Sequence, residues 1–359
     1  MYKKYNQEKK RTRIPETEYL TKMKNDENVL EIDNLRSYFY TDSGTVKAVD
    51  GVSFNIPKGK TIGVVGESGC GKSVTSLSVM RLLQGPQGQI AGGEIRYNQG
   101  DRALNISKLP MSEMQKIRGN EIAMIFQEPM TSLNPVFTIG NQISESIALH
   151  NPEMTKKELK EKVLELLKLV GIVREGIEDS YPHELSGGMK QRVVIAMALS
   201  CNPRLIIADE PTTALDVTIQ AQILDLLRDL KDKINASIML ITHDLGVVAE
   251  MADYVVVMYA GRVIEQGTAS EIYNDPKHPY TVGLMKSRPV LNETTERLYS
   301  IPGNVPNPIG MPNYCYFRNR CEKRMEICKG LYPEITDISD THKVNCYLYQ
   351  EENKQKGEE

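Results

Sequence analysis

Apolar residues along the chain form short strand-like runs in some places and longer helical repeats in others. Thr61 to Val65, Leu205 to Ala208 and Ser237 to Thr242 have the length of buried strands. Ile219 to Leu230 and Lys156 to Val170 instead repeat apolar residues at helical spacing. On the second of these helices the predicted buried face consists of Leu159, Val163, Leu166, Leu167 and Val170. Strands that alternate with helices predict an α/β fold with a mainly parallel sheet and right-handed crossovers.

The two ends of the chain differ in texture from its middle. Residues 1–28 are polar and charged with almost no periodicity, which predicts a disordered tail. The alternative is a basic arm that touches anionic lipid, since basic residues cluster there. They are Lys3, Lys4, Lys9, Lys10, Arg11 and Arg13. After Leu284 prolines and then cysteines become frequent, so we expect a main domain over 29–284, a small loop-rich extension over 285–350 and a charged tail over 351–359.

Composition narrows the class of protein. The chain has 359 residues, enough for one large domain and a smaller one, and its net charge is −3. Near-balanced charge argues against a general nucleic-acid binder, which usually shows a basic excess. No apolar run approaches the roughly 18 to 20 residues that span a bilayer. The basic start lacks the apolar core of a secretory signal, so we expect a cytosolic protein with reduced cysteines.

A glycine-rich loop follows the first apolar strand. Its sequence, Gly66-Glu67-Ser68-Gly69-Cys70-Gly71-Lys72-Ser73, fits the phosphate-binding loop pattern. Glycines let backbone N–H groups turn toward phosphates, and the helix beginning near Lys72 adds its positive end. Lys72 is expected to reach the β- and γ-phosphates of ATP and Ser73 to ligate Mg²⁺. Many small residues can occupy the position of Cys70 in such a loop, so we expect Cys70 to line the loop and to have no redox role. The predicted nucleotide-binding residues are Gly66, Ser68, Gly69, Cys70, Gly71, Lys72 and Ser73.

Two carboxylates follow a second apolar strand. Asp209 and Glu210 come directly after Leu205 to Ala208. In a doubly wound sheet, ligands bind outside the carboxyl ends of the strands. Asp209 is therefore expected to hold Mg²⁺ through water, and Glu210 to orient and polarise the attacking water.

A second anion-binding helix start lies between these two motifs. Ser186, Gly187 and Gly188 precede an apolar helix that runs through Leu199. The positive end of a helix suits a phosphate. Because the chain already has one phosphate loop, a second such terminus makes sense if it serves the nucleotide of another chain.

Together these motifs resemble an ABC-type ATPase over about Val29 to Gly267. The resemblance implies that Gln127 is the glutamine that senses Mg²⁺ and the membrane partner. It also implies that His243, after the third apolar strand, contacts the γ-phosphate.

Two further positions take their roles from the same resemblance. Ala214-Leu215-Asp216 matches the segment that crosses between two ATPases, so Asp216 is expected near the nucleotide of the pair. Phe39 matches the aromatic residue that stacks on adenine, and Tyr40 or Tyr38 can do the same work.

Within the ABC ATPases, the chain is most similar to the D-type ATPase of bacterial dipeptide and oligopeptide importers. The similarity is carried by residues 119–135, by Tyr181-Pro182-His183-Glu184, by Lys277-His278-Pro279-Tyr280-Thr281 and by the cysteine-bearing end. Such importers pair a D-type with an F-type ATPase under two permeases, with an external solute-binding protein, and the family includes nickel importers. The cargo is contacted by other subunits. The resemblance implies an N-terminal antiparallel β portion, a helical insertion over about 138–180 and a location on the cytoplasmic face of the membrane.

Four of the six cysteines crowd the extension. Cys315, Cys321, Cys328 and Cys346 are spaced C-x5-C-x6-C-x17-C, which suits a 4Fe–4S cluster or a tetrahedral zinc ion. The spacing lacks the close C-x2-C pairs of zinc ribbons. The similar importer ATPases are associated with an iron–sulfur cluster, which favours the cluster over Zn²⁺ and over free thiols or disulfides.

The sequence therefore predicts an ATPase subunit of an ABC importer for peptides or related solutes such as nickel. One rival class is the non-transport ABC proteins of DNA repair or the ribosome. Those carry long coiled-coil insertions or two tandem cassettes, and neither is found in this sequence. The other rival is a regulatory binding module, against which Glu210 and His243 indicate turnover.

Overall fold

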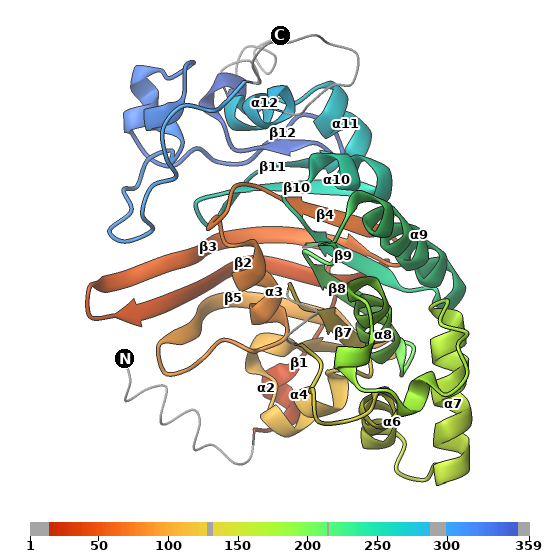
Figure 1. Cartoon of the computed structure of the whole chain (residues 1–359). Helices are drawn as coiled ribbons and strands as arrows, with labels where there is room; N and C mark the ends of the chain where they lie inside the picture. The colour runs from red at the N-terminus through yellow and green to blue at the C-terminus, as the bar shows by residue number, and fades with distance from the viewer. Residues whose placement is uncertain (1–13, 128–131, 214, 288–298, 351–359) are drawn as a thin grey trace. The chain divides into compact units, whose positions relative to one another are not determined.

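A computed structural model describes residues 14–127, 132–213, 215–287 and 299–350 (Figure 1). The chain divides into two compact units. The first unit comprises Met1–Asn55, Thr61–Lys108 and Thr242–Glu359. The second unit comprises Ile56–Lys60 and Leu109–Ile241.

One sheet of the first unit is antiparallel, with strands in the order β1-β6-β5-β2-β3. Its strands are β1 (Leu20–Thr21), β2 (Asn28–Thr41), β3 (Gly44–Pro57), β5 (Gly88–Asn98) and β6 (Ala103–Asn105). On one face, Leu30 lies opposite Tyr97 and Ile32 opposite Ile95, and all four side chains are buried. Such cross-strand apolar pairs fix the register, because a slip by one residue would turn them all to the other face. The short elements α2 (Glu16–Tyr19), η1 (Ile106–Lys108) and α3 (Lys72–Val79) belong to the same unit.

The other strands of the first unit run in the order β12-β13-β11-β10-β4. They are β4 (Thr61–Val65), β10 (Tyr254–Tyr259), β11 (Arg262–Thr268), β12 (Thr336–Asp337) and β13 (Lys343–Val344). Strand β4 pairs in parallel with β10 and is buried at every residue, as its unbroken apolar run predicts. Helix α10 (Leu245–Met251) packs on β4, and α11 (Ala269–Asn274) packs on β11 (Figure 1).

The prediction that residues 1–28 form a disordered tail is wrong for the part that the structure describes. Glu16–Tyr19 forms helix α2, and Leu20 and Thr21 pair with Leu104 and Ala103 as an edge strand. The Tyr19 side chain is buried. One aromatic anchor among charged residues gives no periodic signal, although it suffices to dock the segment. Residues 1–13, including the candidate basic arm, lie outside the described residues.

The cysteine-bearing extension shares its core with the rest of the first unit. Tyr316 and Phe317 are buried in one apolar cluster with Val65, Tyr259 and Tyr280. Phe317 meets Tyr259 edge-on at 5.3 Å between ring centroids and Tyr280 at 5.5 Å. The boundary that the sequence predicts after Leu284 is therefore not a boundary between separately packed cores. The extension also contains η4 (Arg318–Arg320) and η5 (Glu326–Lys329), and α12 (Pro279–Lys286) precedes it. The tail over 351–359 lies outside the described residues.

The second unit has three parallel strands in the order β9-β8-β7, surrounded by helices (Figure 1). The strands are β7 (Ile122–Ile125), β8 (Leu205–Asp209) and β9 (Ser237–Ile241). The helices are α4 (Met111–Ile117), α6 (Ile139–His150), α7 (Lys156–Leu169), α8 (Gly187–Leu199) and α9 (Val217–Ile234), with the short turns η2 (Ile177–Asp179) and η3 (Pro182–Glu184). Helices α6 and α7 lie within the range of the predicted helical insertion.

Caps set the ends of the helices in the second unit. Thr155 and Glu158 form a capping box that starts α7, and Val163, Leu166 and Leu167 are its buried residues. Helix α9 extends beyond the apolar repeat, because Asp216 caps its start and Asn235 ends it in the left-handed conformation. No helix in the described ranges is long and apolar enough to cross a membrane.

The shared aromatic core predicts that Phe317 stabilises the whole first unit. Phe317→Ala removes a side chain that is 3% exposed and should cost about 3 to 5 kcal/mol. The urea midpoint of unfolding, followed by circular dichroism, should fall accordingly. Leu331→Ala is the matched control, since Leu331 lies in the same extension and is 74% exposed. Equal midpoints for the two variants would contradict the shared core.

Candidate nucleotide and cysteine sites

In the first unit, the glycine-rich loop turns sharply between β4 and α3. Gly66, Gly69 and Gly71 all have positive φ, at 148°, 77° and 101°. A Cβ atom on Gly66 would lie 2.2 Å from the carbonyl oxygen of Met258, and one on Gly71 would lie 2.3 Å from that of Ala48. At these two positions only glycine therefore allows the loop to pack this closely against its neighbours.

The lysine of the loop is folded into it. Lys72 is 6% exposed, and its Nζ atom donates to the carbonyl oxygens of Gly66 at 2.7 Å and Glu67 at 3.2 Å. Both acceptors belong to the backbone of the loop, so the ammonium lies inside it. Ser73 is half-buried in the first turn of α3, and Ser68 is exposed on the loop.

Cys70 is fully buried beneath the loop. Burial raises the pKa of its thiol, and the nearby Lys72 ammonium opposes that shift only in part. A buried neutral thiol is inert as a nucleophile, and Cys70 fills space there.

The aromatic residues near the end of β2 have different partners. Phe39 lies opposite Gly88, and its ring covers that glycine, since a Cβ there would lie 2.9 Å from the Phe39 ring. Tyr38 instead donates its hydroxyl to Asp50 at 2.6 Å. Burial, and after it this hydrogen bond to a carboxylate, raises the pKa of Tyr38. All three aromatic candidates are half-buried, and the hydroxyl of Tyr38 is bonded to Asp50.

His243 lies in the first unit on the short turn before α10. The turn is held by Asp244, whose carboxylate accepts from the backbone N–H groups of Gly246 and Val247. His243 itself is exposed.

In the second unit, β8 ends in the two predicted carboxylates. Asp209 is the last residue of the strand and is 3% exposed. Glu210 has a φ of 47°, and its backbone N–H donates to the carbonyl of Ile241 at 2.8 Å. The left-handed region is uncommon for a residue other than glycine and costs backbone strain.

The Glu210 carboxylate accepts hydrogen bonds from two side chains of its own unit. Gln127 donates its Nε2 at 3.0 Å, and Thr213 donates its hydroxyl at 3.0 Å. The structure thus brings together Gln127 and Glu210, which the sequence predicts separately. Thr213 was not predicted, because a threonine three residues after an acid carries no distinctive sequence signal. Residues 128–131, part of the stretch that carries the family resemblance, lie outside the described residues.

Ser186, from the predicted second anion-binding helix start, is the N-cap residue of α8. The Ser186 side chain caps the helix by accepting from the N–H of Met189 at 3.3 Å, and Ser186 is exposed. Gly188 lies against α9, since a Cβ there would be 3.0 Å from Ile219. Gln191, also not predicted, is fully buried and donates to the carbonyl oxygen of Pro211. Helix α8 is therefore tied directly to the segment that follows Glu210.

Asp216 also acts as a helix cap. Its carboxylate accepts from the N–H of Ile219 at 3.0 Å at the start of α9, and the residue is exposed. Ala214, in the same predicted motif, lies outside the described residues.

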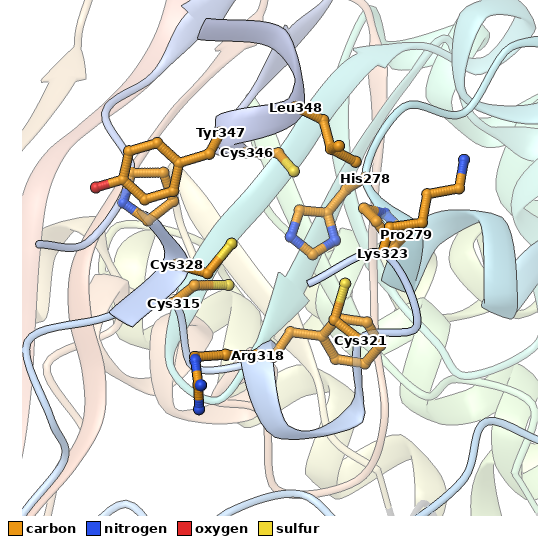
Figure 2. Close-up of a pocket in the computed structure, with 12 residues that line it drawn as sticks. His278, Pro279, Cys315, Arg318, Cys321, Lys323, Cys328, Cys346, Tyr347 and Leu348 are labelled. Carbon is orange, nitrogen blue, oxygen red and sulfur yellow. The ribbon is translucent and has the colours of Figure 1, made fainter. Parts of the chain in front are cut away.

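The four cysteines of the extension line one small cavity of the first unit, together with His278 (Figure 2). The cavity measures about 20 Å³. All four are free thiols, and none of them is paired in a disulfide. Burial raises the pKa of Cys315 to about 11 and that of Cys346 to about 12, and neighbouring cysteines add to both shifts.

As they stand, these thiols do not form a ready metal site. Among the described residues, no group of three or more His, Cys, Asp or Glu side chains is arranged to hold a metal ion. The donor set is nevertheless that of a four-thiolate site, and all of it faces one cavity. A cavity of about 20 Å³ holds little more than one water, so a cluster would need the sulfur atoms to move outward.

Comparison with known proteins agrees with this geometry. A family model for the ABC transporter matches residues 49–213, and a model for the oligopeptide/dipeptide transporter C-terminal region matches residues 264–328. The chain is 52% identical over 325 residues to the oligopeptide transport ATP-binding protein AppD of Bacillus subtilis, covering 90% of this chain and 98% of AppD. The chain belongs to the ATP-binding proteins of the oligopeptide/dipeptide ABC transporter family.

Other relatives agree with that assignment. The dipeptide transport ATP-binding protein DppD of Bacillus subtilis is 50% identical over 90% of this chain and 95% of its own length. Among solved structures, the ATP-binding cassette MJ0796, a dimer in a post-hydrolysis state bound to ADP and Pi, matches 67% of this chain and 98% of its own. Its TM-score is 0.59 at 27% identity. This ABC transporter ATPase therefore has the ATP-binding cassette fold, with a cysteine-bearing C-terminal region that its family also has.

The geometry around Glu210 predicts the effect of removing its charge. Glu210→Gln keeps the side-chain volume and should preserve ATP binding, while kcat falls by about 10² to 10⁴, the range for a positioned base. Steady-state ATPase assays and nucleotide-binding titrations separate the two effects. Glu161→Gln is the control, because Glu161 is an exposed acid on α7 of the same unit. Near-normal turnover of Glu210→Gln would rule out the proposed base.

Proposed function

We propose that this ATPase powers the import of di- or oligopeptides, or of related solutes such as nickel, through partner permeases. The observation that carries the proposal is the strained Glu210 at the end of β8, held by Gln127 and Thr213. A subunit that only bound nucleotide would not need a carboxylate held in this way. The relatives' names supply the transported class, since AppD and OppD of Bacillus subtilis are oligopeptide transport proteins and DppD is a dipeptide transport protein.

The loop of the first unit provides the phosphate contacts in this proposal. Lys72 exchanges its bonds with the carbonyls of Gly66 and Glu67 for bonds with the β- and γ-phosphates. Phe39, with Tyr40 as the alternative, stacks on the adenine. Mg²⁺ would be held by Ser73, Gln127 and Asp209 and would neutralise phosphate charge.

Hydrolysis then needs a positioned water. Glu210 accepts a proton as the water oxygen bonds to the γ-phosphorus, and the bond to the ADP oxygen breaks, leaving ADP and inorganic phosphate. His243 contacts the γ-phosphate and stabilises the charge that develops there. The bond from Gln127 to Glu210 gives the membrane partner a route to this step, because movement of Gln127 changes how the carboxylate is held.

A second ATPase subunit completes each site in this proposal. Ser186, Gly187 and Gly188 form a helix start whose capping serine is exposed, on a chain that already has a phosphate loop. Each ATP would lie between the loop of one chain and this helix start of the other, with Asp216 near the crossing. The dimer of MJ0796 shows that a cassette of this fold pairs.

The remaining partners follow from the family. An F-type ATPase is the proposed second subunit, two permeases form the channel, and a solute-binding protein delivers the cargo. The chain would act on the cytoplasmic face of the membrane, where its permeases reach it.

We further propose a 4Fe–4S cluster on Cys315, Cys321, Cys328 and Cys346. Four free thiols that line one cavity support it. A single Zn²⁺ is the alternative ligand. Either would tie together a segment that contains little regular structure of its own, and no step of hydrolysis depends on it.

If each ATP lies between two chains, this arrangement predicts which pairs of substitutions damage the same nucleotide site. Ser186→Ala combined with replacement of the partner's loop lysine should reduce ATPase activity no further than either change alone, because both damage one site. The matched control is Ser186→Ala with Lys72→Ala in this chain, which damages both sites and should abolish activity. Complete loss in the first combination with activity kept in the control would favour sites contained within one chain. Complete loss in both combinations would indicate strict coupling between the two sites.

The cluster predicts colour and stoichiometry. Protein purified without oxygen should be brown, with about four irons and four sulfides per chain. Cys321→Ser should bleach it, whereas Cys201→Ser should not, since Cys201 lies in the second unit. Colourless anaerobic protein with one zinc per chain would overturn the cluster in favour of the alternative.

A further inference from the structure

An acidic side chain occupies the loop proposed to hold an anion. Glu67 follows the first glycine of the loop. Its backbone carbonyl oxygen accepts a hydrogen bond from Lys72 Nζ at 3.2 Å. A carboxylate at this place repels the phosphates of a nucleotide unless another charge neutralises it. The residue that neutralises Glu67 comes from the cysteine-bearing extension.

Arg320 forms a two-pronged ion pair with Glu67. The two terminal nitrogens of Arg320 lie 2.6 and 2.9 Å from the two carboxylate oxygens of Glu67. Arg320 is 6% exposed and Glu67 is 29% exposed, so solvent screens the pair only in part. The backbone N–H of Glu67 also donates to the Tyr280 hydroxyl at 2.8 Å. Both ends of these contacts lie in the first unit.

The position of Arg320 is fixed both by the extension and by β10. Its Nε atom donates to the carbonyl of Pro302 at 2.8 Å, and its guanidinium lies 5.7 Å from the centre of the Tyr259 ring. Arg320 is the last residue of the turn η4, which lies between Cys315 and Cys321 in the sequence. The N–H of Arg318 donates to the carbonyl of Cys315, and the N–H of Cys321 donates to that of Arg318. The packing of the cysteine turn therefore sets where the guanidinium lies.

We propose that Arg320 is a positioning residue of the nucleotide loop, which neutralises Glu67 and draws its carboxylate aside from the phosphates. Through this ion pair the C-terminal extension sets the affinity of the loop for nucleotide. The inference rests on the proposed role of residues 66–73. Arg320 acts only through Glu67, so it should affect nucleotide binding far more than the chemical step.

The full-length chain tests this by titration with a fluorescent ATP analogue in the presence of Mg²⁺. Arg320→Ala should weaken binding by about fivefold or more, the lower range of a coupling between sites. The KM for ATP should rise in parallel, while kcat at saturating ATP stays close to that of the unmodified protein. Arg320→Gln should give the same weakening and serves if the alanine variant folds poorly, because it retains a donor for Pro302.

Removing the charge of Glu67 distinguishes neutralisation of that charge from a purely structural role of Arg320. In the Arg320→Ala background, Glu67→Gln should recover most of the lost affinity, because the uncompensated carboxylate is gone. Arg324→Ala is the matched control, since Arg324 is an exposed arginine of the same extension, and it should bind like the unmodified protein.

Two results would overturn the proposal. One is unchanged affinity in both Arg320 variants, and the other is a double variant that binds no better than Arg320→Ala. Failure of the nucleotide-loop assignment looks different, because then Lys72→Ala would also leave binding unchanged.

Discussion

The nucleotide loop depends on one steric constraint, the close approach of its backbone to two neighbouring carbonyl oxygens. At Gly66 and Gly71 a side chain would lie within about 2.3 Å of the carbonyls of Met258 and Ala48. With no Cβ atoms there, the loop lies tightly between β4 and α3, and Lys72 reaches back to its carbonyls. An alanine at either glycine would force the loop off its support and misplace the lysine.

The second unit also places a candidate functional residue directly after a buried strand. Strand β8 is buried throughout, and the chain enters the left-handed region at Glu210 directly after it. Because the strand is buried at every residue, its packing defines where Glu210 begins. Gln127 and Thr213 then fix its orientation. Each unit thus has candidate functional residues directly after a buried strand.

Much of this arrangement could be predicted from the sequence, because its signals are local. Apolar runs predicted β4, β8 and β9, and the glycine spacing predicted the loop. Contacts between residues far apart in sequence could not be predicted in this way. The bond from Gln127 to Glu210 and the ion pair from Arg320 to Glu67 depend on tertiary packing, which no local pattern encodes. The docking of Tyr19 escaped prediction for the same reason.

The extension behaves as part of the ATPase rather than as an appendage, because its aromatic residues complete the core beside β4 and its arginine meets the loop. If this ATPase works under membrane permeases, the complex should survive affinity purification of the tagged full-length chain from solubilised membranes. Mass spectrometry should then identify a second ABC ATPase and two multi-spanning permeases in equal amounts. Recovery of the chain only from the soluble fraction, with no membrane protein bound, would contradict it.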